Sequence, residues 1–200
     1  NKNFITTKRG LKINYGYLFN CSGLNADRVS QKFGVTDNFI LLPFKGTYWQ
    51  LSKKAPFSFK TNLYPVPDLK QPFLGIHVTP SVEGKIFLGP SAIPAFGREN
   101  YNGIEKVEFF NSIEFLKILS FQYLANKASF RGYANEQLLQ GLKNKFTDSA
   151  KELIPKLKIE HLEKSNKVGI RPQLYDKKNS KLIHDFKIRK LQNSIHVLNA

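Results

Sequence analysis

The sequence predicts an α/β fold with α+β character, because an opening strand, turn and helix are followed by two β-rich stretches and two helical ones. Apolar residues alternate with polar ones over 11–17. Phe, Ile, Leu, Val, Thr and Tyr, broken by Pro and Gly, dominate 38–51 and 73–89, as in an antiparallel sheet. Apolar residues at helical spacing then occupy 112–124 and 135–157.

The first unit of the chain is predicted to be strand, tight turn, helix. The alternation over 11–17 predicts a strand, and the continuous apolar run 17–19 predicts that this strand becomes fully buried at its end. After a turn at Gly23, residues 25–33 have helical character. Gly34 stands where a glycine commonly caps the end of a helix.

The remaining elements follow from local composition. The proline-rich segment 64–68 predicts a loop between the two β-rich stretches. Pro155 is expected to kink or end the second long helix, since proline lacks the N–H that a helix needs. Three closing strands are expected at 167–174, 181–188 and 195–198.

Bulk composition limits the possible classes of protein. Two hundred residues with 41% hydrophobic content suffice for one large core, or for a domain with parts of another. The single cysteine, Cys21, excludes an internal disulfide, and four scattered histidines give no zinc-site spacing, so no metal is expected. The longest apolar run, Phe39–Phe44, is far shorter than the roughly 20 residues of a membrane-spanning helix. The free cysteine and the lack of a secretion signal favour a cytoplasmic location.

The net charge of +16 and the pI near 9.9 favour contact with polyanions, either nucleic acid or an anionic membrane face. Lysines make up 25 of the 31 basic residues and are spread along the chain. The densest basic stretch, 151–190, lacks the aromatic interleaving that is typical of nucleic-acid modules. We therefore favour a solvated basic surface with no nucleic-acid partner, and a basic nucleic-acid-binding module is the alternative.

Six motifs occur in a fixed order along the chain. They are Asn20-Cys21-Ser22-Gly23-Leu24, Pro43-Phe44-Lys45-Gly46-Thr47-Tyr48, Tyr64-Pro65-Val66-Pro67-Asp68, Pro72-Phe73-Leu74-Gly75-Ile76-His77-Val78-Thr79, Gly89-Pro90-Ser91-Ala92 and Gly169-Ile170-Arg171-Pro172-Gln173. Together these motifs resemble the L-2-hydroxyglutarate oxidases and dehydrogenases, within the FAD-dependent oxidoreductases that include glycine oxidase and D-amino-acid oxidase. The resemblance covers nearly all 200 residues.

The resemblance implies a division into two domains. Residues 1–35 and 166–200 would belong to an FAD-binding domain, and 36–165 to a substrate domain built on a large mixed, mainly antiparallel sheet with flanking helices. It also implies that the chain is a fragment, because the Gly-x-Gly-x-x-Gly fingerprint of the family and the segment after Ala200 are absent. We expect the fragment alone to bind FAD weakly and to be inactive.

The resemblance further implies FAD as cofactor, with flavin contacts at Cys21, Ser22, Gly23, Leu24 and Asn199. A glycine in such a strand-turn-helix corner lets a ligand approach the backbone, although an ordinary tight connection between strand and helix would need the same residue.

His77 is the predicted catalytic base. Gly75, His77 and Thr79 share one face of a probable strand, and Ile76 and Val78 share the other. A histidine can accept the substrate hydroxyl proton while the Cα hydrogen leaves as hydride to flavin N5. The alternative is a hydrogen-bonded structural histidine.

Pro172 holds Arg171 extended, and a guanidinium can bind a carboxylate with two parallel hydrogen bonds. The resemblance to the glycine-oxidase group implies that Arg171 is catalytic and binds the α-carboxylate. A surface salt bridge is its alternative. Lys45 stands where the family usually has arginine and is a candidate for the distal carboxylate. Tyr48 and Tyr64 would donate hydrogen bonds to substrate or pack with other aromatic residues.

The predicted activity is oxidation of a 2-hydroxy acid, L-2-hydroxyglutarate, to 2-oxoglutarate, with oxygen or a membrane quinone as electron acceptor. Ser91 and Pro172 replace the asparagine and alanine common in relatives, which leaves a related amino-acid substrate as an alternative. A non-catalytic scaffold is the other alternative. The basic charge would suit peripheral contact with the inner face of the membrane.

Overall fold

The computed structural model describes residues 3–35, 38–66, 75–126 and 129–199. They form two compact units. Unit 1 combines 1–42 with 172–200, whereas unit 2 is the continuous segment 43–171. The functional division into an FAD-binding and a substrate domain stays a prediction.

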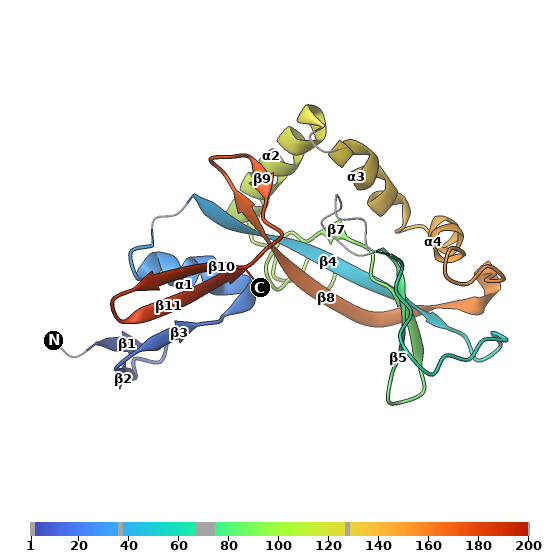
Figure 1. The fold of residues 1–200 in the computed structure, drawn as a ribbon, viewed down its shortest axis with the longest axis horizontal. Coiled ribbons are helices and arrows are strands. Elements are labelled where there is room, and N and C mark those ends of the chain that lie inside the picture. The colour runs from blue at the N-terminus through green and yellow to red at the C-terminus, as the bar shows by residue number, and fades with distance from the viewer. Residues whose placement is uncertain (1–2, 36–37, 67–74, 127–128, 200) are drawn as a thin grey trace. The chain divides into compact units, whose positions relative to one another are not determined.

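Unit 1 holds short strands around one α-helix among its described residues (Figure 1). A hairpin of β1 and β2 is antiparallel. In a second sheet β11 pairs antiparallel with β10 and parallel with β3, so this sheet is mixed. The elements are β1 (Phe4–Thr6), β2 (Lys12–Asn14), β3 (Leu18–Asn20), the 3-10 helix η1 (Gly23–Asn25), α1 (Ala26–Lys32), β9 (Lys181–Leu182), β10 (Lys187–Leu191) and β11 (Ser194–Asn199).

The single strand predicted over 11–19 is wrong, since it is two strands, β2 and β3, in different sheets. The chain bends at Gly16 and Tyr17 between them. Tyr17, in the bend, and Phe19, in β3, are exposed rather than buried. Alternation shows that a segment is extended but does not say which strand it pairs with.

The helix α1 lies within the predicted range, and Gly34 after it has a φ of +84°, the conformation of a glycine cap. The prediction of one closing strand over 181–188 is wrong. These residues are divided between two strands, β9 and β10, which belong to different sheets.

Unit 2 contains most of a six-stranded sheet ordered β5-β6-β4-β8-β9, with β7 paired to β4. β5 with β6, β6 with β4, and β7 with β4 all pair antiparallel, as predicted. In the view of Figure 1, α2, α3 and α4 follow one another on the same side of β4 and β8. The elements are β4 (Phe39–Leu51), β5 (His77–Pro80), β6 (Ile86–Gly89), β7 (Ile93–Pro94), α2 (Phe109–Ala125), α3 (Phe130–Leu139), α4 (Lys143–Ala150), the 3-10 helix η3 (Ile159–His161) and β8 (Leu162–Asp176).

The long helix predicted over 135–157 is wrong, since α3 and α4 are separate helices. Gly141 disfavours helix, and Leu142 adopts the extended conformation from which α4 begins. Pro155 therefore lies beyond a helix that has already ended at Ala150. The predicted fold class, α/β with a mainly antiparallel sheet and flanking helices, is confirmed.

The core of unit 2 lies between the sheet, α4 and the segment that follows α4. Phe146 on α4 is completely buried, and its ring centroid lies 6.2 Å from that of Trp49 on β4. Val78 and Leu88 contribute from β5 and β6. The buried members of this core are Leu51, Ile76, Val78, Leu88, Phe146, Ala150, Ile154, Leu157 and Leu162. No helix in the described part of the chain is both long and apolar enough to span a membrane.

Phe146→Ala should lower the free energy of unfolding of unit 2 by about 3–5 kcal/mol, because it removes a fully buried ring and leaves a cavity. Urea denaturation followed by tryptophan fluorescence would measure this, since Trp49 contacts the lost ring. The exposed neighbour Lys145 supplies the control, and Lys145→Ala should change stability by less than about 0.5 kcal/mol. Equal effects of the two substitutions would contradict this account of the core.

Candidate active site

A turn between β3 and α1 in unit 1 contains four of the predicted flavin contacts, Cys21 to Leu24. Gly23 has a φ of +53°, which L side chains rarely adopt, and a Cβ added there would meet no described atom within 4 Å. The backbone conformation thus favours glycine, and the space beside it is open. Cys21 is exposed. A bound group can therefore approach the backbone of this turn.

The turn is held by a buried polar network that the sequence did not indicate. The Asn20 side-chain amide donates to the Ala26 carbonyl at 2.8 Å and pairs with His196 Nδ1 at 3.1 Å. Asn20 Oδ1 accepts the Ser22 hydroxyl at 2.6 Å. His196 is fully buried, and its Nε2 pairs with the Ser194 hydroxyl at 3.0 Å. The Ser22 backbone N–H also donates to Asn20 Oδ1 at 3.3 Å, and its carbonyl accepts the Asn25 N–H at 3.0 Å, so Ser22 holds the shape of the turn.

Asn199 ends β11, and its side-chain amide donates to the Asp185 carbonyl at 2.8 Å and the Ile183 carbonyl at 3.4 Å. These bonds fasten the segment between β9 and β10 to the end of β11. The predicted flavin contact at Asn199 stays a prediction.

His77, Gly89 and Tyr48 form one row across β5, β6 and β4 in unit 2. His77 pairs with Gly89 in the antiparallel register. A Cβ added to Gly89 would come within 3.0 Å of Tyr48 Cδ1, so the glycine makes room for the tyrosine. One position along, Val78 and Leu88 are fully buried in the core on the other face. His77 and Tyr48 therefore share the face opposite the core.

Tyr64 lies against His77, with ring centroids 4.9 Å apart and an angle of 36° between the ring planes. Burial raises the pKa of Tyr48, and Tyr64 raises it further. The Tyr48 hydroxyl therefore keeps its proton at neutral pH and can donate a hydrogen bond. The structure brings together three residues that sequence reasoning placed at the site.

The environment of His77 favours the neutral imidazole. Its Nδ1 is buried and has no hydrogen-bond partner among the described residues. Burial lowers the pKa of His77 below its usual 6.5, the backbone of Gly75 opposes this, and the positive charge of Lys167 adds to it. A neutral imidazole can accept a proton, which is the property that a general base needs.

Lys167 on β8 was not singled out from the sequence. Its Nζ lies 4.7 Å from the centroid of the Tyr48 ring and 4.6 Å from that of the Phe87 ring. Ammonium groups at such distances are attracted to the faces of aromatic rings. A sequence signal existed, since Lys167 stands four positions before Arg171 on a predicted strand and alternation places the two on one face.

Arg171 is exposed and extended within β8, as expected for the residue before a proline. Its charge acts on Tyr133 of α3, whose pKa is raised mainly by burial and also by Glu136, while Arg171 opposes the rise.

Lys45 differs from Arg171 in the side of the sheet on which it lies. Alternation along β4 places Lys45 on the face opposite Tyr48. The structure does not bring Lys45 together with the His77 row.

Ser91 is buried and belongs to the turn after β6. Its hydroxyl pairs with that of Thr47 at 2.7 Å, and its backbone N–H donates to the Thr47 carbonyl at 3.0 Å. Ser91 thus holds this turn against β4.

Comparison with known proteins now identifies the family. The sequence model of the family described as FAD dependent oxidoreductase matches residues 2–199. The chain belongs to this family. The resemblance found in the sequence is thereby confirmed.

Curated relatives of this FAD dependent oxidoreductase chain carry the name L-2-hydroxyglutarate dehydrogenase. The protein of Indibacter alkaliphilus is 39% identical over 92% of the chain and 45% of the relative. The Escherichia coli K12 protein is 31% identical over 98% and 46%. The human mitochondrial protein is 32% identical over 91% and 38%. The chain thus spans less than half the length of each of these relatives.

A solved structure supports the fold. The dithionite-reduced L-alpha-glycerophosphate oxidase of Mycoplasma pneumoniae, with FAD bound, matches with a TM-score of 0.53. The match covers 98% of this chain and 43% of that one, at 17% identity. This likeness supports the α/β fold expected from the sequence.

Proposed function

We propose that the whole protein uses FAD to oxidise a 2-hydroxy acid, L-2-hydroxyglutarate, to 2-oxoglutarate. One observation carries the proposal: a single face of the sheet gathers five polar groups. They are the half-buried imidazole of His77, the hydroxyls of Tyr48 and Tyr64, and the cationic groups of Lys167 and Arg171 on the neighbouring strand β8. The name shared by the curated relatives supports the choice of substrate.

His77 would act as the general base. Oxidation of an alcohol to a ketone removes the hydroxyl proton, and a neutral imidazole on the open face can accept it. The Tyr64 ring packs against this imidazole, with ring centroids 4.9 Å apart. The hydroxyl of Tyr48, which stays protonated, would donate a hydrogen bond to the substrate.

Arg171 would bind the α-carboxylate. Its guanidinium can form two parallel hydrogen bonds to a carboxylate, which fixes the orientation of the carbon that is oxidised. The extended backbone before Pro172 holds the position of the arginine in β8.

The residues that would hold FAD lie in unit 1. They are the turn at Cys21 to Leu24, where Gly23 leaves the backbone open, and Asn199 at the end of β11. When bound, the flavin supplies the redox chemistry, since it accepts the two electrons of the oxidation.

The decisive test is anaerobic flavin bleaching in the full-length protein. Bound flavin that bleaches on addition of L-2-hydroxyglutarate would support both class and substrate. Bound flavin that bleaches only with an amino acid would replace the substrate, and absence of flavin would contradict the proposal.

The pH dependence of kcat/KM tests the role of His77. Activity needs the neutral base, so kcat/KM should rise as the pH passes upward through the pKa of His77. Because burial holds that pKa below 6.5, the midpoint should lie below pH 6.5 and the plateau should include neutral pH. A steady-state series from pH 5 to 8 would measure this, and a midpoint above 6.5 would contradict it.

We also propose a cytoplasmic location with peripheral contact to the inner face of the membrane, which would suit transfer of electrons to a quinone rather than to oxygen. The helix α2 in unit 2 exposes an apolar surface, and the net charge of +16 favours anionic lipid. Its most exposed apolar residues are Phe109, Phe110, Phe121 and Leu124.

Co-sedimentation with vesicles tests this location. Binding of the full-length protein should rise with anionic lipid content, fall with salt, and weaken when Phe110 and Leu124 are both replaced by serine. Binding that is insensitive to anionic lipid would overturn the proposal.

A further inference from the structure

We propose that Lys167 binds the second carboxylate of a dicarboxylate substrate, so that it makes the site select dicarboxylic over monocarboxylic 2-hydroxy acids. This inference rests on the proposed function. It assigns the distal subsite to β8, the strand that also carries Arg171.

The first observation is the placement of two cations on one face of β8. Exposure alternates along this stretch: Lys167, Gly169 and Arg171 are exposed, while Val168 and Ile170 are half-buried. At about 3.3 Å per residue, the Cα atoms of Lys167 and Arg171 lie about 13 Å apart. Both side chains are long enough to incline toward one another over the residue between them.

That intervening residue is Gly169, and a Cβ added to it would meet no described atom within 4 Å. The face between the two cations is thus open. An extended molecule with a carboxylate at each end can lie along the strand, with one end at each cation.

The second observation is the position of the ammonium group. Its contacts with the Tyr48 and Phe87 rings hold Nζ on the open face of the sheet, on the same side as His77. Lys167 also acts electrostatically on His77, so the cation lies close to the proposed base. A substrate whose hydroxyl reaches His77 therefore comes within reach of this ammonium.

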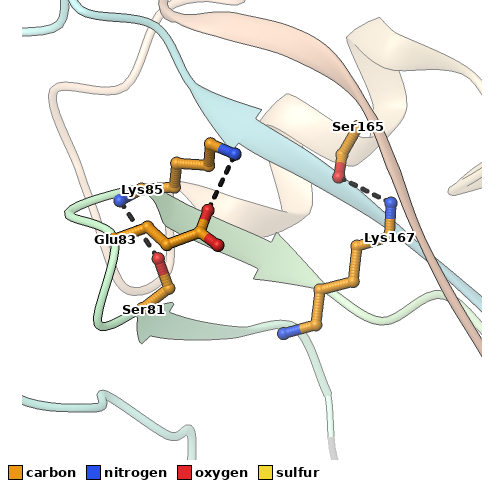
Figure 2. A network of polar contacts seen from close by, with 5 residues as sticks. All are labelled: Ser81, Glu83, Lys85, Ser165 and Lys167. Carbon is orange, nitrogen blue, oxygen red and sulfur yellow. Dashed lines mark hydrogen bonds and ion pairs between the residues drawn. The ribbon is translucent and has the colours of Figure 1, made fainter.

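The third observation is that Lys167 has no carboxylate partner in the described part of the chain. Figure 2 contrasts it with Lys85, whose Nζ forms an ion pair with Glu83 at 2.9 Å. The side chain of Lys167 extends from β8 toward β5 and β6, while its backbone N–H donates to the Ser165 hydroxyl at 3.0 Å (Figure 2). The charged end of Lys167 is therefore available to an anionic ligand.

These observations favour Lys167 over Lys45 for the distal carboxylate. Lys45 lies on the other face of β4 from Tyr48, whereas the ammonium of Lys167 lies directly over the Tyr48 ring.

The experiment compares two unreactive ligands in the full-length flavoprotein by calorimetric titration: glutarate, which has two carboxylates, and butyrate, which has one. Lys167→Met keeps an unbranched side chain that is one heavy atom shorter and removes its charge. We expect it to weaken glutarate binding by about 10- to 100-fold and to leave butyrate within about twofold, because one charge-assisted contact is lost. Lys167→Arg should restore most of the glutarate affinity.

Lys164→Met is the matched control, since Lys164 is an exposed lysine of the same strand on the other face. It should change neither affinity. The KM values for L-2-hydroxyglutarate and L-2-hydroxybutyrate should follow the same pattern as the two ligands.

Three outcomes would overturn the inference. Unchanged glutarate affinity in Lys167→Met would show that the lysine does not bind the ligand. Equal losses for glutarate and butyrate would show a general disturbance of the site. A wild-type flavoprotein that neither binds glutarate nor is reduced by a 2-hydroxy acid would refute both the inference and the proposed function. A different result, in which the wild-type flavoprotein binds glutarate but is not reduced by any 2-hydroxy acid, would refute the proposed function alone.

Discussion

His77→Ala in the full-length flavoprotein should lower kcat for L-2-hydroxyglutarate by about 10²- to 10⁴-fold, the usual contribution of a general base. KM should change much less, because the proton is transferred only in the transition state. Stopped-flow measurement of flavin bleaching would isolate the chemical step. The loss should persist across pH, since the group whose neutral form is required is absent.

His184→Ala is the matched control, because His184 is an exposed histidine outside the His77 row. It should leave kcat unchanged. If His77→Ala retained full turnover, the residue would be a structural histidine stacked on Tyr64, and the base would have to be sought elsewhere.

Arg171→Ala should raise KM by about 100-fold, since charge-assisted hydrogen bonds to the α-carboxylate are lost. Both L-2-hydroxyglutarate and L-2-hydroxybutyrate should be affected, because both carry that carboxylate. Arg171→Lys should recover only part of the loss, since an ammonium lacks the fork geometry of a guanidinium. Steady-state kinetics with both substrates would measure this.

Arg9→Ala provides the control, because Arg9 lies exposed in the turn between β1 and β2. It should alter neither KM value. A rise in KM for L-2-hydroxyglutarate alone would assign Arg171 to the distal carboxylate. Arg171 and Lys167 would then exchange the carboxylates that they are proposed to bind.

Local patterns in the sequence predicted the parts of the fold that depend on local physics. The cap at Gly34 follows from the conformational freedom of glycine, and α1 follows from helical spacing. Period-two alternation placed His77 and Val78 on opposite faces, and the structure confirms it, because Val78 is fully buried in the core.

The features that the sequence patterns do not indicate are contacts between strands that lie far apart in the chain. The contact of Lys167 with Tyr48 joins β8 to β4, and the pair of Asn20 with His196 joins β3 to β11. No residue-level pattern specifies such registers, because any extended segment offers the same backbone hydrogen bonds. The same ambiguity explains why the pattern over 11–19 predicts one strand where the structure has two.

The parallel pairing of β3 with β11 has a consequence for biosynthesis. Asn20 and His196 are 176 positions apart, so the sheet that supports the turn at Gly23 cannot close until the ribosome has released β11. Unit 2 is a continuous segment whose core residues have all been translated by Leu162. Because domains fold as units during translation, the sheet face that carries His77 should form first, while β3 waits for its partner β11.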